Sequence, residues 1–283
     1  MTQSAGPVAE KSARRIRLRP LTIVGSRAIA LLEFLGGLSY LLRDTALSFP
    51  RGLLASRGRR MAWQNLWAQM VRVGVRSVPI VMLVLFCIGA ILALQTAPVL
   101  KAYGAVSQVA NIISVAVFRE MGPLVSAIVL TGFAGASIAA EIGTMVVSEE
   151  IEALESEAIN PIRFLVLPRV VATTIMMVCV AVIGDITGIL GGLVVSTQLL
   201  GISRVQYVHR TFEAVRVSDF STGLIKSAVF GMLISALACF LGLRVTGGAQ
   251  GVGVATTRTV VLTIVALIFV DLMFTAFFYY YGY

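Results

Sequence analysis

Five long apolar stretches follow one another along the chain, and most polar residues gather between them or before them. The stretches cover about 77–95, 124–147, 170–198, 224–243 and 259–280. Each is near or above the roughly 20 residues that an α-helix needs to cross the hydrocarbon core of a bilayer. The pattern predicts an all-α integral membrane protein whose five transmembrane helices form one domain, 77–283.

The residues before the first stretch have a different pattern. Residues 1–22 are basic and predict a disordered tail, whereas 23–76 alternate apolar and charged positions. Within that region, 23–47 and 62–75 are each typical of an amphipathic helix that lies in the membrane interface, the second forming an elbow into the bilayer. Two ordinary soluble helices are the alternative for these segments.

Composition supports a membrane location. The chain is 58% hydrophobic and 13% charged, against roughly 25% charged residues in soluble proteins. Its net charge is +9, and 13 of its 23 Lys and Arg residues precede Ser77. Such clustering beside apolar spans marks the cytoplasmic face. We therefore expect a cytoplasmic N-terminus and, after five crossings, a C-terminus on the far side with an aromatic belt at 277–283. We expect no nucleic-acid binding, since no binding module is recognisable.

Few residues suggest catalysis. No phosphate-binding loop of the GxxxxGK[ST] type occurs, so the chain is not itself an ATPase of that kind. His209 is the only histidine, and the three cysteines show no metal-binding spacing. We expect no catalytic residues, no metal site, no cofactor bound by this chain and no removable signal peptide.

A short acidic segment lies between the second and third stretches. Ser148 is a candidate N-cap, and acidic residues in a first turn favour a helix. Ile151 and Leu154 would form a narrow apolar face. The segment is either a solvated turn or a helix that docks into the groove of another protein.

Charged groups inside or beside apolar spans are costly unless they are paired or hydrated, so four carboxylates need an explanation. They are Glu120, Glu141, Asp185 and Asp271. We expect structural pairing for Asp185 and Asp271. Arg119 and Glu120, at the expected outer entry to the second span, would pair with each other or meet a lipid headgroup.

Small residues recur at helical spacing within two of the spans. Gly184, Gly188 and Gly192 form one row, and 135, 139 and 143 form another. Such rows allow helices to approach closely in lipid. They predict packing within the chain, with a dimer face as the alternative.

Several motifs in order resemble the MlaE/YrbE family of ABC permeases, the membrane subunits of MCE-protein lipid transport systems. They are VGVRSVP at 73–79, FREMGPL at 118–124, AAEIGTM at 139–145, NP at 160–161, PR at 168–169, GVG at 251–253 and ATTR at 255–258. The sequence departs from the family at Phe133, where many members carry Arg, at Val254, and at 155–158.

The resemblance implies an MlaE-type permease in the bacterial inner membrane that moves phospholipid and contributes to outer-membrane lipid asymmetry. Its implied partners are a second copy of the chain, cytoplasmic ATPase subunits that bind ATP and Mg, a ring of MCE-domain proteins and a small cytoplasmic accessory protein. Lipid-contacting positions of the family fall on Leu92, Val99, Leu100, Tyr103 and Glu120. The coupling helix that docks on the ATPase falls on Glu149, Glu150, Ile151, Glu152, Leu154 and Glu155.

Two other functions fit the residues. A proton-coupled secondary transporter would use Glu141, Asp185 and Asp271 as a proton relay. A passive membrane scaffold of an envelope complex would need neither a relay nor a coupling helix.

Overall fold

The computed structural model describes residues 25–281 apart from 27, 30–31 and 49–58. The predicted basic tail, 1–22, lies outside the described residues. Within the described part the chain is almost entirely helical and contains no strand, as the apolar pattern predicts.

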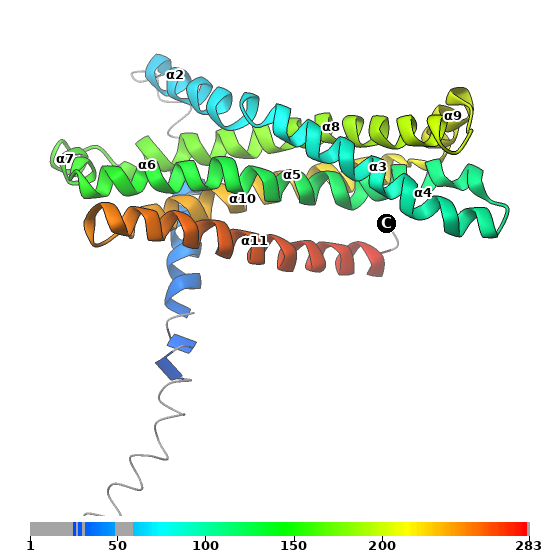
Figure 1. Cartoon of the computed structure of the whole chain (residues 1–283). Coiled ribbons are helices and arrows are strands. Elements are labelled where there is room, and N and C mark those ends of the chain that lie inside the picture. The colour runs from blue at the N-terminus through cyan, green and yellow to red at the C-terminus, as the bar shows by residue number, and fades with distance from the viewer. Residues whose placement is uncertain (1–24, 27, 30–31, 49–58, 282–283) are drawn as a thin grey trace, which may run out of the picture.

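Five helical segments are long and apolar enough to cross a membrane: Gln64–Ala102, Val106–Val147, Ile162–Gln198, Val217–Gly242 and Gly248–Tyr280. They run side by side as one bundle (Figure 1). The predicted number of spans is confirmed. Their helices are α2 (Arg59–Met70), η1 (Val71–Val75) and α3 (Val78–Ala102) in the first span; α4 (Val109–Ala116), η3 (Val117–Met121), α5 (Gly122–Leu130), η4 (Thr131–Gly135) and α6 (Ala136–Val147) in the second; η5 (Ile162–Val166) and α8 (Leu167–Gln198) in the third; α10 (Val217–Gly242) in the fourth; and α11 (Gly248–Tyr280) in the fifth.

The helical segment that contains the predicted second span, 124–147, begins well before residue 124. It begins at Val106 and continues through Pro123, because the π-helical turn η3 ends one residue before Gly122-Pro123 and accommodates the missing N–H of Pro123 without ending the helix. The first span likewise continues past residue 95, through Pro98 to Ala102. Arg119 and Glu120 therefore lie within a continuous helical segment.

Small residues bring the spans into close contact, as their spacing predicts. A Cβ added at Gly89 of α3 would overlap the carbonyl oxygen of Gly188 on α8, and one added at Gly191 would overlap that of Phe86. In the second span, a Cβ at Gly143 would lie 2.8 Å from a methyl group of Val245. The predicted rows themselves pack within the chain: Gly184 and Gly188 lie against α3, and Gly135 lies against Ile234 of α10.

The helix at 32–48 runs across the bundle instead of along it (Figure 1). Leu38 and Leu41 are buried, and the ring of Phe34 meets that of Phe240 on α10 edge to face at 5.2 Å. This arrangement fits a helix in the membrane interface. The expected elbow, in contrast, continues directly into the first span through the π-helical turn η1.

Two short helices mark opposite ends of the bundle (Figure 1). Helix α7 (Glu150–Ser156) connects α6 to η5, and α9 (Arg204–Ala214) connects α8 to α10. Burial within the bundle is uneven, since 67% of the most apolar window of α10 is buried, against 28% for 64–102 and 11% for α11. Helix α10 therefore forms the centre of the fold, and α3 and α11 leave broad apolar faces uncovered.

Candidate functional site

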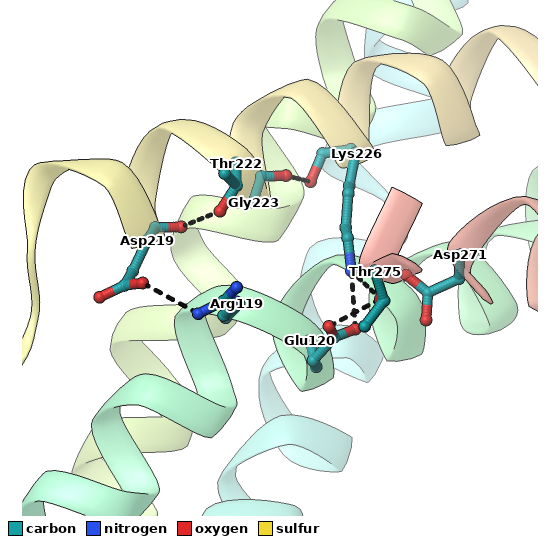
Figure 2. Close-up of polar contacts among 9 residues, drawn as sticks. Arg119, Glu120, Asp219, Thr222, Gly223, Lys226, Asp271 and Thr275 are labelled. Carbon is teal, nitrogen blue, oxygen red and sulfur yellow. Dashed lines mark hydrogen bonds and ion pairs between the residues drawn. The ribbon is translucent and has the colours of Figure 1, made fainter. Parts of the chain in front are cut away.

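A buried lysine joins three spans through a polar cluster that we call the Lys226 cluster: Glu120, Lys226, Asp271 and Thr275. The Lys226 ammonium lies 2.7 Å from Glu120 Oε2 and 2.9 Å from Asp271 Oδ1. It also donates a hydrogen bond of 3.0 Å to the Thr275 hydroxyl, which in turn donates to Glu120 Oε1 at 2.9 Å. Figure 2 shows these side chains converging from η3, α10 and α11.

Burial differs within the Lys226 cluster. The lysine side chain is 1% exposed, whereas that of Asp271 is 13% and that of Glu120 is 27% exposed. One ammonium between two carboxylates leaves a formal charge of −1, and its most accessible atoms belong to Glu120. The cluster therefore holds its cation inside the protein and presents a carboxylate at the surface of the bundle.

One of our two expectations was that Arg119 pairs with Glu120, but the structure shows no such pair. Instead, Arg119 Nη1 lies 3.7 Å from Asp219 Oδ1 on α10 (Figure 2). Neighbouring residues on a helix point in different directions, so the two charges separate. Both pairs connect η3 to α10. The π-helical turn is thus anchored to its neighbour by two ionic contacts.

The carboxylates predicted to be structurally paired behave differently. Asp271 pairs with Lys226, which confirms that expectation. The expectation for Asp185 was wrong within the described part of the chain, because the residue is 4% exposed, forms no ion pair there, and its Oδ1 atom has no hydrogen-bond partner there. That oxygen packs against Gly122, where an added Cβ would overlap it. The absence of a side chain at Gly122 makes room for the buried Asp185.

Glu141 forms a second charged cluster nearer the α7 end. Its carboxylate lies 2.8 Å from Arg72 Nη1 and 3.3 Å from Arg169 Nη2. Arg169 is buried and also donates a hydrogen bond of 2.9 Å to the carbonyl of Leu165. The three carboxylates proposed for a proton relay therefore have three different surroundings: Glu141 lies between two arginines, Asp271 lies beside Lys226, and Asp185 has no ion pair to a described residue.

The predicted lipid-contacting residues other than Glu120 all lie on α3 or at its C-terminal cap. Leu92 and Leu100 are partly buried against a cluster that includes Ile113 and Tyr207. Val99 and Tyr103 are 59% and 81% exposed. No hydrogen bond or ion pair among the described residues connects Glu120 to these four positions. Their lipid-binding role stays a prediction.

Helix α7 forms where the acidic segment predicts a helix, with its ends set by backbone geometry. The expected N-cap was wrong: Glu149 occupies that position with φ 60°, and the Ser148 hydroxyl donates to Glu150 Oε1 at 2.8 Å. The glutamates are exposed, whereas Ile151 and Leu154 are half-buried. At the far end, Asn160 Oδ1 accepts the N–H groups of Ile162 and Arg163 at 3.0 and 3.3 Å and so caps η5.

Lys226 is the functional candidate that sequence reasoning missed. A lysine within the apolar run 217–242 is as costly in a bilayer as the four carboxylates, and the same rule identifies it. Among the described residues, no group of three or more His, Cys, Asp or Glu side chains is arranged to hold a metal ion.

The five spans, with charged clusters between them, define a multi-pass membrane protein. The family model described as Permease MlaE matches residues 66–277. The chain therefore belongs to the MlaE family of ABC transporter permeases, which are membrane components that work with a separate ATPase subunit.

Known proteins agree with this assignment. A protein of Rickettsia felis described as a probable ABC transporter permease protein is 38% identical over 211 residues, which cover 75% of this chain and 82% of that protein. A similarly described protein of Synechocystis is 35% identical over 74% of this chain and 79% of its own length. The Arabidopsis thaliana protein TRIGALACTOSYLDIACYLGLYCEROL 1, chloroplastic, is 31% identical over 78% of this chain and 63% of its own length.

Proposed function

We propose that this permease moves phospholipid between the inner membrane of a bacterium and a channel of MCE-domain proteins, driven by ATP hydrolysis in its partner ATPase. The Lys226 cluster carries the proposal, because it places a partly exposed carboxylate, Glu120, between spans that otherwise present apolar side chains. A path for an amphipathic lipid needs both kinds of surface. The Arabidopsis relative, whose name contains that of a galactolipid, adds support for a lipid substrate.

The uncovered faces of the bundle support a dimer. On α11, Val265, Phe269 and Leu272 are each more than 60% exposed, and on α3 Leu83 is 66% exposed. Apolar faces of this kind contact lipid or a second subunit. In the proposed homodimer the α3 and α11 faces of two copies enclose the lipid path, with Leu92, Val99, Leu100, Tyr103 and Glu120 along it.

The exposed acidic surface of α7 supports its assignment as the coupling helix. Its carboxylates would meet basic residues of the ATPase, placing α7 and the N-terminus in the cytoplasm and the C-terminus in the periplasm. ATP-driven closure of the ATPase would push on α7 and shift the spans between two packed arrangements. The MCE ring and the small accessory protein of the family would complete the complex.

Photocrosslinking during turnover tests the lipid path. Photoreactive residues at Leu92, Leu100 and Tyr103 are expected to capture phospholipid in an ATP-dependent manner when the permease and its ATPase are reconstituted together. Ile175 on α8 is 42% exposed but lies on a helix outside the proposed path, and serves as the control. Equal, ATP-independent labelling at all four positions would mean that the α3 residues contact only bulk lipid.

An ionophore separates the proposal from its main rival. Transport that requires ATP and its ATPase, and that persists when the proton gradient is collapsed, is expected. Transport that proceeds without the ATPase and stops with the ionophore would instead identify a proton-coupled transporter.

A further inference from the structure

A small cavity lies beside the Glu141 cluster, between η1 and the junction of η4 with α6. It has a volume of about 150 Å³ and its wall includes Arg72, Arg76, Gln69, Ser137 and Phe133. This volume has room for about five water molecules. It admits a compact polar group such as a phosphodiester but not a pair of acyl chains.

Positive charge exceeds negative charge around this cavity. Arg72 and Arg169 share the single carboxylate of Glu141, and Arg76 forms no ion pair with a described residue. The wall itself holds Arg72, Arg76 and Glu141, a formal excess of +1, and Arg169, which shares Glu141 from outside the wall, raises the local excess to +2. Because charge without a counter-ion is costly beside an apolar span, the cavity favours occupation by an anion.

Hydrogen-bonding capacity points the same way. Arg72 offers one nitrogen to Glu141 and has further N–H groups, since a guanidinium carries five of them. The Ser137 side chain adds a hydroxyl to the same wall. Planar guanidinium groups bind phosphate with paired hydrogen bonds, which makes phosphate the anion that best suits this wall.

Apolar side chains line part of the cavity, Val73, Phe133 and Ile138 among them, and others flank it. Phe133 is 36% exposed, and Val71 and Val75 on the adjoining turn are 49% and 56% exposed. A free inorganic anion gains nothing from these side chains, whereas the acyl chains of a lipid do. The arginines are accessible too, since 43% of the Arg72 side chain is exposed and Arg76 is exposed. Accessible arginines flanked by exposed apolar side chains therefore suit a membrane lipid whose phosphate meets the arginines.

The position of the cavity along the second span fits one leaflet of the bilayer. Glu141 follows Glu120 by 21 residues on a continuous helical segment. At 1.5 Å per residue this separates the two clusters by about 30 Å, the thickness of the hydrocarbon core. If the Lys226 cluster lies at one interface, the arginine cavity lies at the other, on the side of α7.

We infer that the cavity lined by Arg72, Arg76 and Ser137 binds the phosphate of a membrane lipid from the leaflet on the α7 side. It is a second lipid site, distinct from the predicted contacts on α3. Its part in transport rests on the proposed lipid function, but the binding itself is measured without transport.

Native mass spectrometry of the full-length protein, titrated with phosphatidylglycerol, tests this site. Arg76→Gln is the cleanest variant, because it leaves both ion pairs of Glu141 in place. We expect it to weaken the tightest phosphatidylglycerol binding about fivefold, and Arg72→Gln with Arg76→Gln to weaken it about 25-fold. Arg163→Gln, which removes an exposed charge from η5 at the same end, is the matched control and should leave this binding unchanged.

Two results would overturn the inference. An Arg76→Gln protein that binds phosphatidylglycerol as the wild type does, or no more weakly than the Arg163→Gln protein, would show that the cavity holds no lipid phosphate. Displacement of the lipid by millimolar inorganic phosphate would identify the site as one for a free anion. Failure of ATP-dependent crosslinking on α3, with the Arg76 effect intact, would reject the transport function but not this site.

Discussion

Replacing Lys226 by methionine tests whether the Lys226 cluster holds the spans together. The substitution keeps a long side chain but leaves the Glu120 and Asp271 carboxylates without their cation. Removing one partner of a buried ion pair costs about 3–5 kcal/mol. Because Glu120 is partly exposed, we expect the lower end of this range, about 3 kcal/mol.

A stability change of about 3 kcal/mol corresponds to a fall in melting temperature of roughly 6–12 °C for a chain of this size. Thermal unfolding of the purified protein in detergent, followed by intrinsic fluorescence, measures it. Charge balance supplies the matched control. Adding Glu120→Gln and Asp271→Asn to Lys226→Met removes the unpaired charges, and we expect this triple variant to regain most of the lost stability.

The same variants separate structure from function. The triple variant should be stable yet defective in ATP-dependent lipid crosslinking, because it lacks the Glu120 carboxylate. The reasoning is refuted if Lys226→Met costs less than about 1 kcal/mol, the ordinary cost of a surface ion pair. It is also refuted if the triple variant is no more stable than the single one.

Four further outcomes are expected. Reversing Glu149, Glu150 and Glu152 to lysine should abolish co-purification of the ATPase, whereas Glu213→Lys on α9 should not; retained ATPase binding in the triple variant would contradict the coupling role. Gly89→Ala should lower the melting temperature because its Cβ overlaps the Gly188 carbonyl, whereas Gly132→Ala, which meets nothing within 4 Å, should leave it unchanged or raise it. Ala158→Gly should stabilise the protein by about 1 kcal/mol, since Ala158 has φ 59°, and chemical unfolding measures this gain. Burial raises the pKa of Tyr207 from 10.0 to about 12. As the pH rises, the unfolded chain therefore loses the phenol proton before the folded protein does, and the free energy of unfolding should fall between pH 10 and 12. The fall should be smaller in Tyr207→Phe.

The number of spans and their helical nature were predictable because the length and apolarity of a segment decide whether it crosses a bilayer. The second span shows where this reasoning fails. Gly122 and Pro123 are normally read as the start of a helix, and only the backbone reveals the π-helical turn that carries the helix through them. Composition does not encode that turn.

The partners of buried charges were less predictable than their presence. The cost of charge in lipid identified Glu120 and Asp271, but their common partner is 106 residues from one and lies on another helix. For Asp185 the sequence predicts a partner where the structure provides only space, which is left by the missing side chain of Gly122. A single sequence shows which groups need partners, whereas the packing of helices decides which groups meet.

The connection between α6 and α8 contains no glycine, although two of its residues, Glu149 and Ala158, adopt left-handed backbone angles. Because every residue of the connection carries a Cβ, fewer backbone conformations are open to it than to a glycine-containing linker. Asn160 Oδ1 also accepts an N–H group of the following turn. A displacement of α7 would therefore deform this connection very little. The displacement would instead be transmitted to α6 and α8, the two membrane helices that the connection joins.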